Sequence, residues 1–167
     1  PLYLLGWIMP PEPDAPPQLD RTDQRILEAL QDDARRSVAD LAALVSLSHT
    51  PVWRRVRALE AAGVIAGYHA HLDERRLGFG VRGFVQLQLE NHTAEIATAF
   101  EREVQLLDQV LACHNLSGKY DYQLEVIARS LDDFASFVRE RVRRLPGVRE
   151  IATSFSLREV KGARRVP

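Results

Sequence analysis

The chain has 167 residues, of which 46% are hydrophobic and 27% are charged, and this composition is typical of a soluble globular protein. Its formal net charge of −1 excludes a strongly basic protein that coats nucleic acid, so any contact with DNA must come from a local cluster of basic residues. The single cysteine excludes an intrachain disulfide, and no apolar run reaches the roughly 18 residues that a membrane span needs, so we expect a cytoplasmic protein.

Residues 1–18 predict a disordered or tag-like tail that is rich in proline. Residues 1–8 are apolar and carry no basic side chain, which disfavours a signal peptide. Residues 9–18 contain five prolines, which exclude a helix and favour an extended tether. Our hypothesis is that Met9 is the natural start of the protein, and we assign the tail no function.

Residues 19–63 predict three helices that together form a helix-turn-helix domain. Apolar residues recur at helical spacing over residues 22–32, 38–45 and 49–62. Gly63 follows the third helix, at a position where a left-handed residue is favoured. Each helix has a polar side chain near its start that can cap it: Asp20 or Thr22 for the first, Ser37 with Asp40 for the second, and Ser48 for the third.

The third helix is expected to have two different faces. At about 100° per residue, Val52, Val56 and Leu59 lie together and are predicted to pack on the other two helices. Arg55 lies beside that inward face, and we expect it to pair with an acid of the first helix such as Asp23. The opposite face carries arginines, a hydroxyl and an indole without an acid, which suits DNA bases and phosphates but is also typical of a solvated helix. The candidate DNA-contacting residues are Ser48, His49, Thr50, Trp53, Arg54 and Arg57.

Residues 64–80 are predicted to form a β hinge between two domains. Residues 64–72 are rich in β-forming side chains and predict a strand, on which His69 and His71 share one face without a third metal ligand. Residues 73–80 contain Gly78 and Gly80 and predict a flexible connection.

Residues 81–160 predict a ferredoxin-like βαββαβ domain, so the fold class of the chain is α+β. Strands are expected over residues 81–90, 108–116, 121–128 and 148–157, and helices over residues 93–106 and from Ser130 to a break at Pro146. Right-handed crossovers place both helices on one face of the sheet. The other face carries Phe84, Ile127 and Ala112 among polar residues, so we predict a dimer interface there.

Several segments, taken in order, match one known family. They are residues 19–27, 33–35, 47–65, 118–122, 145–148 and 153–157. Together they resemble the Lrp/AsnC regulators, also called feast/famine or leucine-responsive regulators, and the resemblance covers residues 19–161. Ser46 departs from the pattern, because the family often has glycine at this turn and serine adopts a left-handed conformation only at a cost.

The resemblance implies a winged helix-turn-helix that binds operator DNA, a β hinge, and a ligand-sensing domain of the RAM type over residues 81–160. It also implies a homodimer that assembles into octamers, and a small effector, usually an amino acid, bound near the Gly-x-x-Asp turn. By match of motif, Gly118, Tyr120 and Asp121 are the candidate effector residues, and Leu116 and Ser154 are added as expected neighbours of that turn. Asp121 can accept the ammonium group of an amino acid, or it can simply cap the turn.

Two alternatives to a DNA-binding regulator remain open from the sequence. One is an enzyme subunit similar to siroheme decarboxylases, and the other is an oligomeric sensor module that does not bind DNA. No Ser/His/Asp set, phosphate loop or cysteine pair is present, and Cys113 and His114 are expected on opposite faces of a strand. His92 is expected to start a helix. We therefore expect no catalytic residue, no cofactor and no metal site.

Overall fold

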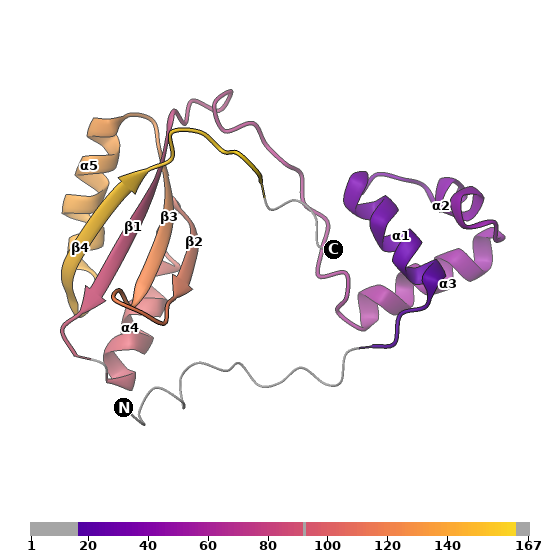
Figure 1. The fold of residues 1–167 in the computed structure, drawn as a ribbon, viewed down its shortest axis with the longest axis horizontal. Helices are drawn as coiled ribbons and strands as arrows, with labels where there is room; N and C mark the ends of the chain where they lie inside the picture. Colours follow the sequence, from indigo (N-terminus) through magenta and orange to yellow (C-terminus); the bar gives the residue numbers. More distant parts are fainter. Residues whose placement is uncertain (1–16, 92, 163–167) are drawn as a thin grey trace. The chain divides into compact units, whose positions relative to one another are not determined.

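The structure is a computed structural model that describes residues 17–91 and 93–162, which form two compact units divided between Ala70 and His71. The first unit is helical, and the second contains a sheet with helices (Figure 1). Most of the tail expected at residues 1–18 lies outside the described residues, as does His92. Among the described helices, none has the length and apolar character needed to cross a membrane.

The first unit consists of the three helices that the sequence predicts. They are α1 (Arg21–Asp32), α2 (Val38–Val45) and α3 (His49–Ala61). The side chain of Asp20 caps α1 by accepting hydrogen bonds from the backbone N–H groups of Thr22 and Asp23, both at 2.8 Å, and Ser37 forms the expected capping box at α2. Ser48 occupies the position before α3, but its side chain makes no capping hydrogen bond, so that part of the expectation is wrong.

The core of the first unit lies where the helices cross. Ile26 of α1, Leu41 of α2 and Val52 of α3 are buried together. Ser46, in the turn between α2 and α3, has the left-handed conformation with φ of 57°, and it is the one described residue other than glycine with positive φ. Gly63 follows α3 with φ of 69°, as the sequence predicts.

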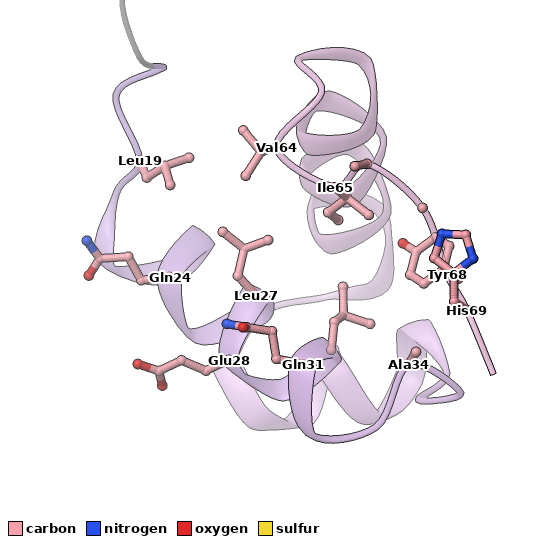
Figure 2. Close-up of a pocket in the computed structure, with 13 residues that line it drawn as sticks. Leu19, Gln24, Leu27, Glu28, Gln31, Ala34, Val64, Ile65, Tyr68 and His69 are labelled. Atoms are coloured by element: carbon pink, nitrogen blue, oxygen red, sulfur yellow. The ribbon is translucent and has the colours of Figure 1, made fainter. Parts of the chain in front are cut away.

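The strand predicted at residues 64–72 is absent from the described residues, and with it the shared strand face of His69 and His71. A strand requires hydrogen bonds to a neighbouring strand, and the described residues provide none for this segment. Val64 and Ile65 instead pack partly on the helical core and leave a groove of about 740 Å³ beside α1. Figure 2 shows Leu27 and Val64 lining this groove from opposite sides.

Residues 73–80, predicted to be a flexible hinge, form a compact turn that belongs to the second unit. The backbone N–H of Phe79 donates to the carbonyl oxygen of Glu74 at 2.9 Å. The guanidinium of Arg129 lies 5.4 Å from the centroid of the Phe79 ring, and Arg82 forms an ion pair with Glu74. These contacts hold the turn against the sheet.

The second unit is an antiparallel sheet of four strands in the order β2-β3-β1-β4. The strands are β1 (Val81–Leu89), β2 (Val110–Asn115), β3 (Tyr122–Ala128) and β4 (Val148–Phe155), and the helices are α4 (Ala94–Val104) and α5 (Leu131–Glu140). A short 3-10 turn, Val142–Arg144, follows α5, which therefore ends before Pro146. The sequence predicts that the last strand extends to Leu157, but β4 ends at Phe155 and Leu157 is 94% exposed.

One face of the sheet carries both helices, as the right-handed crossovers predict (Figure 1). Val85 and Leu124 are paired across β1 and β3 and are buried in a cluster with Phe100 of α4 and Phe134 of α5. Gly83 allows this packing, because a Cβ atom there would lie 2.4 Å from the Phe134 ring.

The opposite face of the sheet is open in the single chain. Phe84 is half-buried there, while Gln86 donates to the side chain of Gln123 at 3.3 Å and Arg82 pairs with Glu125. The face therefore combines apolar and polar groups, as the alternation along the strands predicts.

We expect Ser46→Gly to raise the free energy of unfolding by about 0.5–1 kcal/mol, because glycine removes the left-handed strain while making the unfolded chain more flexible. Urea unfolding followed by helical circular dichroism measures the change. The matched control is Gly63→Ala, where nothing lies within 4 Å of the added Cβ atom. That substitution should lower stability through backbone strain alone, and a stabilising effect of Gly63→Ala would contradict the argument.

Candidate functional site

The two faces of α3 are separated as the helical wheel predicts. Val52 and Leu59 are buried against α1 and α2. The candidate DNA-contacting residues are all exposed, and Trp53 is 54% exposed. A hollow of about 260 Å³ lies where α2 and α3 begin, lined by Val38, His49, Thr50 and Trp53. The exposed face therefore presents aromatic, hydroxyl and guanidinium groups beside two helix N-termini.

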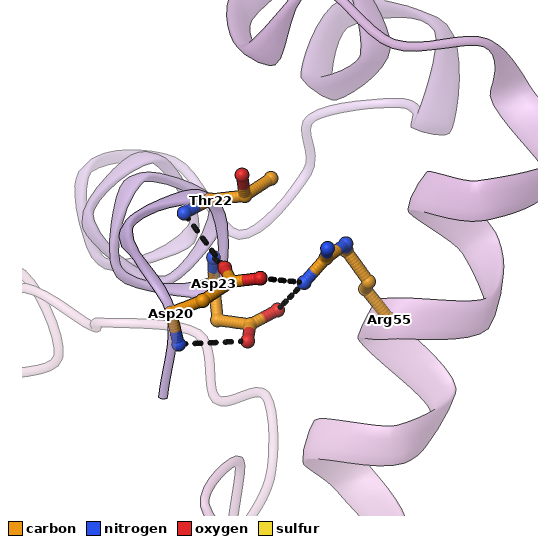
Figure 3. A network of polar contacts seen from close by, with 4 residues as sticks. All are labelled: Asp20, Thr22, Asp23 and Arg55. Atoms are coloured by element: carbon orange, nitrogen blue, oxygen red, sulfur yellow. Dashed lines mark hydrogen bonds and ion pairs between the residues drawn. The ribbon is translucent and has the colours of Figure 1, made fainter. Parts of the chain in front are cut away.

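Arg55 joins α3 to the start of α1 (Figure 3). Its Nη1 atom lies 2.7 Å from Asp20 Oδ2 and 2.8 Å from Asp23 Oδ1. The pairing with Asp23 is confirmed, and the pairing with Asp20 adds a contact that the sequence does not indicate. The hydrogen bonds that Arg55 donates to the two carboxylates, first to that of Asp23, raise the pKa of Arg55. The pKa of Asp20 is lowered, chiefly by the hydrogen bond from the backbone N–H of Asp23. Hydrogen bonds from Arg55 and from the N–H of Thr22 add to this effect, while burial opposes it.

Arg57 has two neighbours on the outward face of α3. Its Nη1 atom lies 3.1 Å from Glu60 Oε2, and its guanidinium lies 5.7 Å from the centroid of the Trp53 ring. The hydroxyl of Tyr68 donates to the other oxygen of Glu60 at 3.0 Å. Neither Glu60 nor Tyr68 is predicted from the sequence to take part in this surface. The spacing of three between Arg57 and Glu60 is a usable signal, whereas nothing local indicates the contact with Tyr68.

The turn between β2 and β3 is held to the sheet by Asp121. Its backbone N–H donates to the carbonyl oxygen of Leu87, and its side-chain Oδ2 accepts from the backbone N–H of Leu89, both at 2.8 Å. The N–H of Leu116 donates to the carbonyl oxygen of Asp121 at 2.8 Å, which places Leu116 beside the turn as expected. The Asp121 side chain therefore joins the turn to β1, which differs from the turn cap that the sequence left open beside an effector role.

Polar side chains surround the turn. Lys119 Nζ lies 3.2 Å from the hydroxyl of Tyr120, and this hydrogen bond raises the pKa of Lys119. Gln88 donates to the carbonyl oxygen of Lys119 and accepts from Arg149 Nη2 at 2.8 Å. Beside Gly118 the space is open, because a Cβ atom there would meet nothing within 4 Å. The turn thus combines a base that is hydrogen-bonded to β1 with cationic side chains and open space beside Gly118.

The single chain does not bring Ser154 to this turn. Ser154 lies on β4 opposite Phe84, whereas the turn contacts β1 at Leu87 and Leu89. Strand residues rise about 3.4 Å each, so Ser154 lies well along the sheet from Asp121. The expectation that Ser154 neighbours the turn is therefore wrong within one chain.

Cys113 and His114 point to opposite faces of β2, as expected. Cys113 packs against the core, and burial raises the pKa of its thiol to about 11, so the reactive thiolate is rare near neutral pH. His114 is exposed. Within residues 17–91 and 93–162, no group of three or more His, Cys, Asp and Glu side chains is placed to hold a metal ion.

Comparisons with known proteins match both units. Residues 19–60 match the AsnC-type helix-turn-helix domain, and residues 82–166 match the Lrp/AsnC ligand binding domain. The Bkd operon transcriptional regulator of Pseudomonas aeruginosa is 41% identical over 86% of this chain and 94% of its own length. The chain belongs to the Lrp/AsnC family of transcriptional regulators.

Two further regulators are similar to this chain over most of its length. The leucine-responsive regulatory protein of Escherichia coli is 36% identical over 89% of this chain and 90% of its own length. A transcriptional regulator of Neisseria meningitidis, solved as a complex with L-Met, has a TM-score of 0.86 at 31% identity and covers 90% of this chain and 97% of its own. The α+β fold predicted from the sequence, with an N-terminal helix-turn-helix and a C-terminal four-stranded sheet, is confirmed for this Lrp/AsnC protein.

We expect the stabilising effect of the Asp20 carboxylate to disappear in acid. The pKa of Asp20 is lower in the folded chain than its ordinary value of 3.8. The ionised carboxylate therefore stabilises the folded state fully at pH values above 3.8, and this stabilisation is lost as the pH falls through the folded-state pKa. The difference in unfolding free energy between the unmodified chain and Asp20→Asn should therefore be larger near neutral pH than in acid. Urea unfolding across this range measures it, and a difference that does not change with pH would contradict the assignment.

Proposed function

We propose that this chain is a sequence-specific DNA-binding regulator that responds to a small effector, most simply an amino acid. The observation that carries the proposal is the exposed face of α3, which presents Trp53, Arg54 and Arg57 while its inner face is buried and tied to α1 by Arg55. In a helix-turn-helix, the second helix of the motif enters the major groove with such a face.

The residues of this face are expected to make different kinds of contact with DNA. Arg54 and Arg57 have the planar donor groups that bridge guanine O6 and N7 or grip phosphate. Thr50 and His49 lie at the start of α3, where base edges are usually contacted. Ser48 keeps its hydroxyl out of the helix cap, so this group is available to a phosphate oxygen.

The open face of the sheet is the proposed dimer interface. Phe84 on this face is half-buried, and the buried Ile127 and half-buried Ala112 lie on neighbouring strands. A second copy that covers the face removes Phe84 from water. A twofold dimer then places two recognition helices on half-sites about one helical turn apart. We propose that such dimers assemble further, to octamers, and this multiplies the affinity that one small arginine-bearing face provides.

The turn around Gly118 is the proposed effector site. Within the described residues, the backbone N–H groups of Gly118, Lys119 and Tyr120 donate no hydrogen bond, so they are available to a carboxylate. The Asp121 carboxylate lies at the end of the same turn and supplies negative charge for an ammonium group. Leu116 completes this site, and Ser154 can join it only from another copy. The L-Met complex of the Neisseria regulator supports an amino acid as the class of ligand.

Arg54→Ala and Arg57→Ala should each weaken binding to a DNA duplex that the unmodified chain selects from a random library. The loss of one bidentate arginine contact corresponds to about 1–3 kcal/mol in favourable cases. Fluorescence anisotropy at fixed salt measures affinity, and light scattering measures oligomer size, which should not change.

A loss of the oligomer in either arginine variant would show that this face of α3 contacts protein rather than DNA. If the unmodified chain selects no sequence and its binding does not depend on salt, the DNA-binding function itself is wrong.

Asp121→Asn should abolish the thermal shift that an amino acid produces while leaving the fold intact. Asparagine retains an oxygen that can accept from the N–H of Leu89 but lacks the charge that an ammonium group requires. The measurement is a thermal-shift screen with each common amino acid on both proteins. An unchanged shift in the variant would assign Asp121 to the structure of the turn alone.

A further inference from the structure

We propose that Glu60 and Tyr68 are positioning residues that hold Arg57 in the orientation that reads DNA. The inference rests on the proposed function, since it takes Arg57 as a DNA contact. It adds two residues to the recognition surface, and one of them, Tyr68, lies outside the helix-turn-helix in the segment that leads to the second unit.

The carboxylate of Glu60 is shared between two partners. One oxygen accepts from the Tyr68 hydroxyl at 3.0 Å, and the other lies 3.1 Å from Arg57 Nη1. The Glu60 side chain is only 29% exposed, whereas that of Arg57 is 66% exposed. Because the hydroxyl fixes one oxygen, the carboxylate cannot rotate freely, and its second oxygen stays directed at the guanidinium.

Arg57 is thereby held from two sides. Glu60 contacts Nη1, and the ring of Trp53 lies 5.7 Å from the guanidinium carbon. Within residues 17–91 and 93–162, the polar contact of Arg57 uses Nη1 alone, so Nε and Nη2 remain as a pair of donors with the geometry that bridges guanine or phosphate. An arginine that is already ordered loses less conformational entropy on binding DNA than one that moves freely.

The ion pair alone is too weak to provide this order. An exposed pair at a spacing of three contributes little, typically less than about 1 kcal/mol. The additional constraint comes from Tyr68, which lies eight residues after Glu60 in the chain. Its hydroxyl donates to the Glu60 carboxylate and so fixes the orientation of that acid. Figure 2 places Tyr68 beside Ile65 and His69, in the segment that runs along the groove.

Tyr68→Phe is the cleanest probe, because it removes one hydroxyl and leaves the net charge unchanged. Substituting Glu60 would also raise the affinity for any DNA by removing a negative charge. In the full chain we expect Tyr68→Phe to lower the affinity for the selected duplex about threefold to tenfold, the range for one hydrogen bond. Affinity for a scrambled duplex and the thermal midpoint should stay the same.

A double-mutant cycle decides whether Tyr68 acts through Arg57. If it does, Tyr68→Phe has no further effect on the selected duplex once Arg57→Ala is present. The matched control is a second cycle with Arg54→Ala, a neighbouring exposed arginine that has no ion pair among the described residues. In that background the full effect of Tyr68→Phe should remain.

Three results would overturn the proposal. The first is that Tyr68→Phe leaves the affinity for the selected duplex unchanged. The others are that Tyr68→Phe still lowers this affinity when Arg57→Ala is present, or that it no longer lowers it when Arg54→Ala is present. Failure of the proposed function gives a different result, because the unmodified chain would then select no duplex and its binding to DNA would not depend on salt.

Discussion

The contact of Arg55 with Asp20 and Asp23 is the interaction on which the DNA-reading half of the chain depends. One guanidinium, at 2.7 and 2.8 Å from the two carboxylates, fixes the inner side of α3 to the first turn of α1. Asp20 is also the cap of α1, so the same carboxylate stabilises the helix start and the crossing of two helices. The outward face of α3 can present a fixed surface because its inward face is anchored in this way.

A carboxylate has a comparable place in the second unit. The side chain of Asp121 accepts the N–H of Leu89 where the pairing of β1 with β4 shifts its register. Its backbone N–H donates to Leu87, two residues earlier on the same strand. The turn from Gly118 to Tyr120 is therefore hydrogen-bonded to β1 at its base, while the space beside Gly118 is open.

Local signals predicted most of the fold, and contacts between distant residues explain most of what was missed. Caps at Asp20 and Ser37 and the spacing of apolar residues placed the helices, because these interactions join residues a few positions apart. The strand expected at residues 64–72 did not form, since a strand depends on a partner that local sequence does not specify. Ser154 was misplaced, and the contact of Tyr68 with Glu60 was missed, for the same reason: each depends on how separate elements meet.

The charge of the chain shows why neighbouring arginines of α3 must have different roles. With a net charge of −1, the chain has enough acids to pair many of its arginines. Arg54 and Arg55 are adjacent, yet about 100° of helix rotation separates them, so Arg55 meets Asp20 and Asp23 while Arg54 faces outward. Arg57 is intermediate, since Glu60 orders it without burying it. The exposed surface that this helix offers to DNA is therefore set by which arginines the fold leaves without an acidic partner.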